Sequence, residues 1–226
     1  IRFPLGGIGT GTVCLGGRGE LREWEIFNRP NRDSWLPFSL FFLRVRRGEG
    51  SPLLRVLERE WMPPYEGTRG VTEEAAPGLP RFRRAAFTGQ YPSARLELLD
   101  DAVPLRVRLH AFNPLVPLDV ERSAVPAAIF SWKLENTAAE PLDIDLYASL
   151  YNACGYEGHG VIGSRSHEGA GGNVNEFIRS DHVRGIFMRQ EGLQESDPVY
   201  GTMALSSSWQ QGGYQLRVGE DCGWAN

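Results

Sequence analysis

Lysine is nearly absent from this chain of 226 residues: Lys133 is the only one, although lysine and arginine together number 24. A Walker loop ends its glycine-rich turn with Gly-Lys-Ser or Gly-Lys-Thr, and no lysine lies near the glycines at the amino terminus. The dinucleotide-binding pattern fails too, because Thr12, Val13 and Cys14 follow Gly11 where a third glycine would be due, and no helical pattern follows. Nucleotide binding is therefore not expected.

Long apolar runs and a basic excess are also missing. No run of eighteen apolar residues occurs, so no transmembrane segment is expected. The formal net charge is −4, whereas a nucleic-acid-binding protein would carry a basic face. Neither a membrane span nor nucleic-acid binding is predicted.

Cysteines are few, odd in number and far apart: Cys14, Cys154 and Cys222. This spacing gives neither a disulfide framework nor the paired ligands of a zinc site. We expect buried free thiols in a reducing cytosol, and hence a cytoplasmic location.

Helical periodicity is lacking as well, and a period of two takes its place. Apolar and polar residues alternate over 103–110, 128–135 and 142–151, as in strands with one buried face. The turn-rich link Asn136–Pro141 predicts a hairpin between the last two. Further strands are expected at Phe38–Arg46, Leu53–Leu57, Ala94–Leu99, Phe177–Arg179, Val183–Met188, Met203–Ser207 and Tyr214–Val218.

Many short strands without helices between them predict an all-β fold, a large antiparallel β-sandwich of two sheets with long loops. The loops are expected at Pro63–Pro80 and at Asn152–Asn175, the second too long for a simple hairpin turn. A domain boundary could fall in the second loop. Because the strand pattern resumes directly after it, we expect residues 1–226 to form a single domain.

The amino terminus is the most distinctive segment. Six glycines fall between Gly6 and Gly17, and charged residues then alternate with large apolar ones from Gly19 to Pro30. Glycines at this density allow backbone to approach other backbone, or a ligand, without an intervening Cβ. The segment after them predicts one strand or hairpin that ends in a turn at 28–31.

Several motifs are similar to those of one enzyme family. They are the run Pro4–Gly11, the segments Arg18-Gly19-Glu20 and Trp24–Phe27, the stretch Phe87–Pro92 with Leu96-Glu97-Leu98, the stretch Ala111–Leu118, and the turn from Asn136-Thr137 to Glu140-Pro141. In this order they resemble the amino-terminal domain of glycoside hydrolase family 116, which includes bacterial β-glucosidases and the non-lysosomal glucosylceramidase, or bile-acid β-glucosidase. The resemblance spans nearly the whole chain.

The resemblance implies a large, supersandwich-like β-sandwich placed before a helical (α/α) barrel. In this family the barrel carries a Glu nucleophile and an Asp acid/base for retaining hydrolysis, so no catalytic residue and no cofactor are expected in this chain. The chain starts at Ile1 without an initiator Met and stops at Asn226, as an excised amino-terminal piece would. Its expected partner is the carboxy-terminal helical domain of the same parent chain, and the parent's substrate would be a β-glucoside or glycolipid.

The residues most suggestive of function follow the glycines. Aromatic rings stack on sugar C–H faces while Arg, Asn and carboxylates bind the hydroxyls, so we single out six candidates for the substrate rim or a domain interface: Arg18, Glu20, Trp24, Phe27, Asn28 and Arg29. The alternative is that Trp24 and Phe27 are core residues and their polar neighbours cap a turn. An apolar patch toward the partner domain could include Trp35, Trp61, Phe87 and Tyr91.

Two other constellations invite chemistry. Glu23 and Glu25, two apart on a strand, would lie about 6–7 Å from each other, a spacing that permits a glycosidase pair. Acidic pairs at this spacing are nevertheless common on solvated strands, and catalysis by them is the less favoured alternative. His159 and His167 lie near Cys154 in a glycine-rich loop, but flexible backbone is a poor support for metal ligands, so no metal site is predicted. His110 is expected to face solvent, and His182 to lie in a turn.

Three functions therefore remain from the sequence. The favoured one is a non-catalytic domain that supports the catalytic barrel and lends a loop to the rim of its active site. The second is an independent carbohydrate-binding module. The third is a self-sufficient hydrolase that uses Glu23 and Glu25.

Overall fold

The computed structural model describes residues 1–27, 30–32, 34, 36–63, 75–156 and 172–209. These residues form two compact units, of which the first comprises residues 1–151 and the second the described residues from Asn152 onward. The boundary falls at the start of the long loop expected at Asn152–Asn175. That residues 1–226 fold as one domain stays a prediction.

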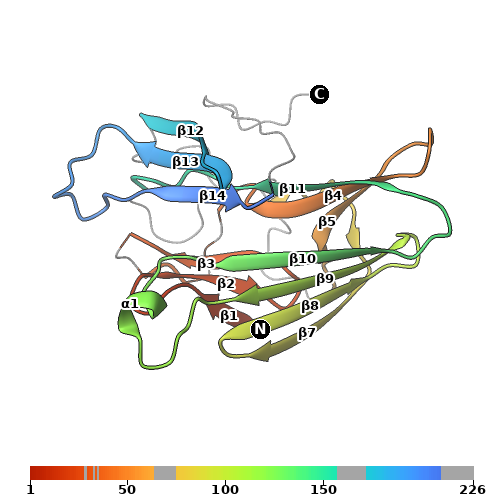
Figure 1. Ribbon diagram of the computed structural model, residues 1–226, viewed down its shortest axis with the longest axis horizontal. Coiled ribbons are helices and arrows are strands. Elements are labelled where there is room, and N and C mark those ends of the chain that lie inside the picture. The colour runs from red at the N-terminus through yellow and green to blue at the C-terminus, as the bar shows by residue number, and fades with distance from the viewer. Residues whose placement is uncertain (28–29, 33, 35, 64–74, 157–171, 210–226) are drawn as a thin grey trace. The chain divides into compact units, whose positions relative to one another are not determined.

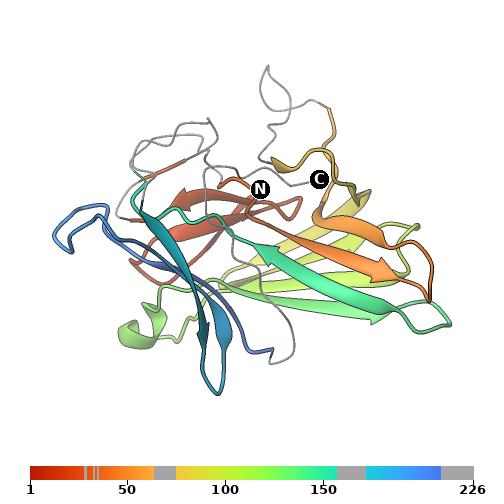
Figure 2. The same ribbon diagram turned by 90° about the horizontal axis from the view of Figure 1, so that it is seen from above.

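The first unit contains three sheets, shown in Figures 1 and 2. The amino-terminal sheet has the order β1-β2-β3, all antiparallel, with β1 (Arg2–Leu5), β2 (Thr12–Gly16) and β3 (Leu21–Glu25). The second has the order β10-β9-β8-β7, with β7 (Arg84–Gln90), β8 (Ser93–Leu99), β9 (Leu105–Phe112) and β10 (Ile129–Asn136). The third has the order β11-β4-β5-β6, with β4 (Leu40–Arg46), β5 (Leu53–Arg59), β6 (Arg81–Phe82) and β11 (Asp143–Ser149).

The two four-stranded sheets pack face to face. The ring of Phe41 on β4 lies 5.3 Å from that of Phe130 and 5.5 Å from that of Trp132, both on β10. Alternate residues of β9, beginning with Leu105 and Val107, are buried as the period of two predicts. Figure 2 shows β11, β4 and β5 overlying the other sheet. The predicted all-β sandwich is confirmed, and all pairings between described strands are antiparallel except that of β5 with the short β6.

One predicted connection is wrong. The link Asn136–Pro141 does not close a hairpin, because β10 pairs with β9 while β11 pairs with β4 in the opposite sheet. The turn itself exists: the Asn136 side chain donates to Glu140 O and accepts from Ala138 N, each at 2.8 Å. Alternation along two strands shows that each buries one face. It does not tell whether the strands lie side by side or face each other across a core.

Five elements of the first unit were not predicted. Strands β1, β2 and β7 carry glycine, proline or mixed polar residues that hide the period of two, and β6 has only two residues, too few to show a period. The fifth is a single helical turn, α1 (Val120–Ser123), whose N-cap Asp119 accepts from Arg122 N at 2.9 Å. Among the described residues, no helix is long and apolar enough to cross a bilayer.

The second unit contains one antiparallel sheet of order β12-β13-β14. Asn152 and Asn173 tie its first residues to this sheet, since Asn152 Nδ2 donates to Asn175 Oδ1 at 2.8 Å and Asn173 Nδ2 donates to Cys154 O at 2.9 Å. The strands are β12 (Asn173–Arg179), β13 (Arg184–Gln190) and β14 (Met203–Ser207). These agree with the three strands predicted there, while Tyr214–Val218 lies outside the described residues.

Candidate functional site

The tip of the β2–β3 hairpin lies against strand β5. Gly19 has φ +103°, and a Cβ at this position would be 2.7 Å from Leu57 O, so glycine permits both the turn and the close approach. Arg59 N then donates to Arg18 O at 2.7 Å. The hairpin thereby brings its charged side chains next to those of β5, far away in the sequence.

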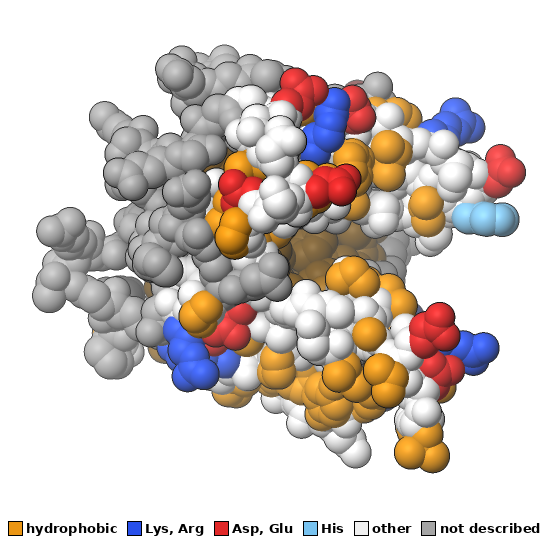
Figure 3. Space-filling model, turned by 90° about the vertical axis from the view of Figure 1, so that its left-hand side faces the viewer, with side chains coloured by type: hydrophobic (Ala, Val, Ile, Leu, Met, Phe, Trp, Pro, Cys, Tyr) orange, Lys and Arg blue, Asp and Glu red, His pale blue; other side chains and the backbone are white. Residues whose placement is uncertain are grey.

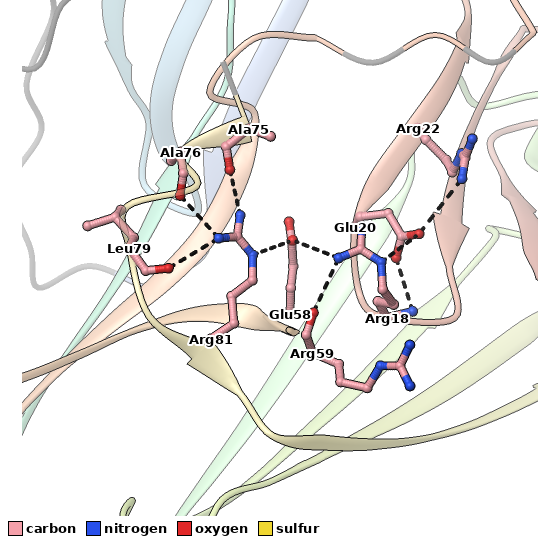
Figure 4. Close-up of polar contacts among 9 residues, drawn as sticks. All are labelled: Arg18, Glu20, Arg22, Glu58, Arg59, Ala75, Ala76, Leu79 and Arg81. Carbon is pink, nitrogen blue, oxygen red and sulfur yellow. Dashed lines mark hydrogen bonds and ion pairs between the residues drawn. The ribbon is translucent and has the colours of Figure 1, made fainter. Parts of the chain in front are cut away.

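Between these elements lies an open pocket of about 530 Å³, which we call the arginine pocket. Its walls come from the first strand, the hairpin, the end of β5 and the start of β7. The lining residues are Ile1, Arg2, Gly17, Arg18, Glu20, Arg22, Arg59 and Ala85. Figure 4 shows how several of these side chains lie.

Glu20 joins the arginines of the hairpin. Its carboxylate accepts from Arg18 N at 3.0 Å, and its Oε1 lies 3.6 Å from Arg18 Nε and 3.9 Å from an Arg22 Nη. Arg18 also donates to Arg59 O at 3.2 Å. The side chains of Arg18 and Glu20 are each about one-fifth exposed or less, which fixes their geometry and leaves them accessible from the pocket.

Behind the pocket lies a buried ion pair between Glu58 and Arg81, 3.0 Å apart. Arg81 also donates to the backbone oxygens of Ala75, Ala76 and Leu79, so each of its three guanidinium nitrogens makes a hydrogen bond (Figure 4). Burial raises the pKa of Glu58, and this outweighs the attraction of Arg81 and Arg18 that acts in the opposite direction.

Trp61 covers this network. The guanidinium carbon of Arg81 lies 3.8 Å from the centroid of its ring, and that of Arg18 lies 4.9 Å from it. Such cation–π contacts orient both arginines. Trp61 is half-buried and packs against charged groups. Its place in an apolar patch toward a partner domain stays a prediction.

The other sequence candidates are dispersed. Trp24 is buried, with 8% exposure, and its backbone N donates to Ser34 Oγ at 3.1 Å. Phe27 is half-buried at φ 54°, while Asn28 and Arg29 lie outside the described residues. The structure thus brings Arg18 and Glu20 together in the pocket. A contact of any of the six with substrate or a partner domain stays a prediction.

Glu23 and Glu25 do not continue a regular strand. Glu23 has φ 52°, beside an irregularity in the β2–β3 register, and its buried carboxylate pairs with Arg2 at 2.8 Å. Glu25 lies 3.7 Å from Arg32.

Burial, with Glu23 as its hydrogen-bond partner, raises the pKa of the neighbouring Cys14 thiol to about 11. Cys14 and Cys154 are both free and buried, as predicted, and Cys222 lies outside the described residues.

The histidines add no chemistry to the pocket. His110 is exposed, and His182 lies in a turn in which its N donates to Ser180 Oγ, so both predictions are confirmed. His159 and His167 are outside the described residues. Within the described ranges, no group of three or more His, Cys, Asp or Glu residues could hold a metal ion.

A second feature was missed by the sequence analysis. Several exposed apolar side chains gather on the excursion between β9 and β10 and on the neighbouring glycine loop. We call this set the apolar surface: Ile8, Val116, Leu118, Val120 and Val125. Figure 3 views the molecule from the side on which α1 lies in Figure 1, and hydrophobic side chains gather in its lower part.

The backbone beneath the apolar surface is held firmly. Ser123 exchanges hydrogen bonds with Val116 through its Oγ, at 3.0 Å each, and its carbonyl accepts from Ile8 N at 2.8 Å. Gly7 makes this approach possible, because a Cβ there would lie 2.3 Å from Val125 O. The side chain of Asn113 bridges to Gly6 N and Pro4 O. The glycines thus serve contacts between backbone segments.

Comparison with protein families places the chain. Residues 2–224 match the family described as beta-glucosidase 2, glycosyl-hydrolase family 116 N-term. A β-sandwich with this match defines the class, and the chain belongs to the amino-terminal domain family of glycoside hydrolase family 116.

Proposed function

We propose that this chain is the non-catalytic amino-terminal domain of a retaining β-glucosidase or glucosylceramidase-like hydrolase. It packs on the helical catalytic domain of the same parent chain, supports it, and lends a loop to the rim of its active site. The observation that carries the proposal is the apolar surface, which the described residues leave uncovered.

Single exposed apolar residues are ordinary on protein surfaces, whereas a group of them on one braced segment marks an interaction site. Leu118 shows this most clearly. It is fully exposed and has φ 65°, a left-handed conformation that costs a residue with a Cβ roughly 1–2 kcal/mol. A strained backbone that presents a leucine to solvent is explained by a partner that buries the leucine.

The carboxylates support a non-catalytic role. Glu20, Glu23 and Glu58 each lie within 4 Å of an arginine, and Glu58 is buried behind the pocket. A glycosidase needs two carboxyl groups flanking one bond, one of them able to donate a proton. The ion pairs of Glu23 and Glu58 instead connect strands of the fold, and those of Glu20 lie within the β2–β3 hairpin.

The test uses the helical domain that the source gene is expected to encode after Asn226. The two purified parts are mixed and their association is measured by analytical ultracentrifugation. Leu118→Asp and Val120→Asp should weaken it at least tenfold, because a buried charge replaces apolar contact. Leu54→Asp, at an exposed position of β5, is the matched control and should leave it unchanged. Equal effects at all three positions would contradict the proposed surface.

The two alternatives have their own readouts. Saturable quenching of tryptophan fluorescence by oligosaccharides would favour a carbohydrate-binding module. Turnover of an aryl β-glucoside by this chain alone, lost in Glu25→Gln, would favour a self-sufficient hydrolase. We expect neither.

A further inference from the structure

We propose that the arginine pocket binds an oxyanion, a carboxylate or a phosphate, on the guanidinium of Arg59. This inference is independent of the proposed docking on a helical domain. It rests on the charge of the pocket, on the incomplete hydrogen bonding of Arg59 and on the fixed positions of the surrounding groups.

The pocket is basic, although the chain is acidic as a whole. Four arginines line it, namely Arg2, Arg18, Arg22 and Arg59, and the one acidic lining residue is Glu20. Glu23, Glu58 and Arg81 lie directly behind these groups. Counting them gives five arginines against three glutamates, an excess of two positive charges in a chain of net charge −4. Such an excess in a concave site attracts anions.

Arg59 differs from its neighbours. The other three lining arginines each have a carboxylate within 4 Å: Glu23 for Arg2, and Glu20 for Arg18 and Arg22. Among the described contacts, the Arg59 guanidinium donates only to Met62 Sδ at 3.6 Å, a weak acceptor. Its Nε is buried, and no acceptor among the described residues bonds to it. Figure 4 shows this side chain pointing away from the Glu58 carboxylate.

A buried donor without an acceptor is costly, and native structures rarely keep one without a reason. The guanidinium presents its N–H groups as a planar fork, which matches two oxygens of a carboxylate or phosphate. A bound oxyanion would both accept a hydrogen bond from Arg59 and balance the positive excess of the pocket. A neutral sugar hydroxyl would accept the hydrogen bond but would not balance the charge.

The site is also preformed. Arg59 N donates to Arg18 O, Arg18 donates back to Arg59 O, and Trp61 stacks against Arg18. The pocket of about 530 Å³ lies in the range of small-molecule sites. Little ordering is therefore required when an anion enters, which favours affinity.

The test is isothermal titration calorimetry of the 226-residue chain with sodium phosphate and with sodium citrate, at an ionic strength held constant with sodium chloride. We expect saturable binding at one site for at least one of the two probes. Arg59→Ala should weaken it at least tenfold. Arg47→Ala removes the same charge from an exposed arginine paired with Glu140, and should leave the affinity unchanged.

Circular dichroism tests whether the Arg59→Ala variant is folded. If that variant is unfolded, Arg59→Lys is used in its place. Lysine keeps the charge but not the planar fork, so Arg59→Lys should still weaken binding several-fold. No saturable binding of either probe, or equal affinities of the Arg59 and Arg47 variants, would overturn the proposal.

Two sources of the oxyanion are distinguished by repeating the titration on the longer parent protein. Binding that persists there identifies a free small anion, and binding that is blocked identifies a carboxylate of the parent chain as the occupant. Leu118→Asp should leave phosphate and citrate binding intact, so failure of the docking proposal and failure of this one give different results.

Discussion

The arginine pocket and the apolar surface both include residues of the amino-terminal sheet or its loops, yet they differ in how their side chains are satisfied. At the pocket, charged side chains lie close together and pair mostly with one another, as in the contacts of Glu20 and Glu58. At the apolar surface, the backbone is satisfied through Ser123 and Asn113, but the side chains above it face solvent. Most charged groups of the pocket have partners within the chain, whereas the side chains of the apolar surface are not covered by any described residue.

The difference follows from how much neighbouring structure each kind of interaction needs. Ion pairs and hydrogen bonds are satisfied by a few neighbouring groups, so a hairpin and one strand suffice for the pocket. Apolar side chains are stabilised in proportion to the area removed from water, which a short excursion cannot cover by itself. A domain that supports another would therefore present an apolar surface and keep its buried charges paired. Among the lining arginines of the pocket, Arg59 is the one for which no carboxylate of the described residues lies within 4 Å.

The largest effect is expected when the buried ion pair behind the pocket is removed. Arg81→Met should lower the free energy of unfolding by about 3–5 kcal/mol, because the buried Glu58 loses its closest partner. Urea denaturation followed by fluorescence measures this.

Two controls separate charge from packing. Arg84→Met breaks an exposed pair with Asp101 and should cost less than about 1 kcal/mol. Adding Glu58→Met to Arg81→Met should recover most of the loss, since no buried charge then remains. Equal losses for Arg81→Met and Arg84→Met would contradict a buried, structural pair.

The apolar surface can be tested through its backbone. Gly7→Ala should destabilise the chain by about 1–3 kcal/mol, because the new Cβ would meet Val125 O, which cannot move aside as a side chain would. Gly78→Ala is the matched control: a Cβ there meets no described residue within 4 Å, so stability should be unchanged or raised by up to about 1 kcal/mol. If Gly7→Ala were as stable as the wild type, the close approach of these two loops would be refuted.

Strand β2 connects the two regions, and its thiol gives a smaller, pH-dependent effect. The pKa of Cys14 is raised from 9.0 to about 11, so its contribution to stability is complete below pH 9 and is lost as the pH rises through 11. Between pH 8 and pH 10 the free energy of unfolding should fall by about 1 kcal/mol on this account. Cys14→Ala should lack this component, and parallel pH profiles of the two proteins would argue against it.

The sequence predicted most strands of the sandwich, because one buried face imposes a period of two on β4, β8 and β9. It also singled out Arg18 and Glu20 as candidates. It missed Arg59, because an arginine at the end of an alternating strand looks like any solvated residue. It also wrongly predicted a hairpin at Asn136–Pro141, because the strand with which another strand pairs depends on the whole chain and not on the link between them.

The fold class, the family and the glycines that let the backbone of the first loop approach other segments can be read from the amino-acid sequence. Which charges meet and which apolar residues stay uncovered depends on the folded chain, because alternation and glycine content are local properties of the chain. The arginine pocket and the apolar surface arise from contacts between residues about 40 and more than 100 positions apart, such as Arg18 with Arg59 and Ile8 with Ser123.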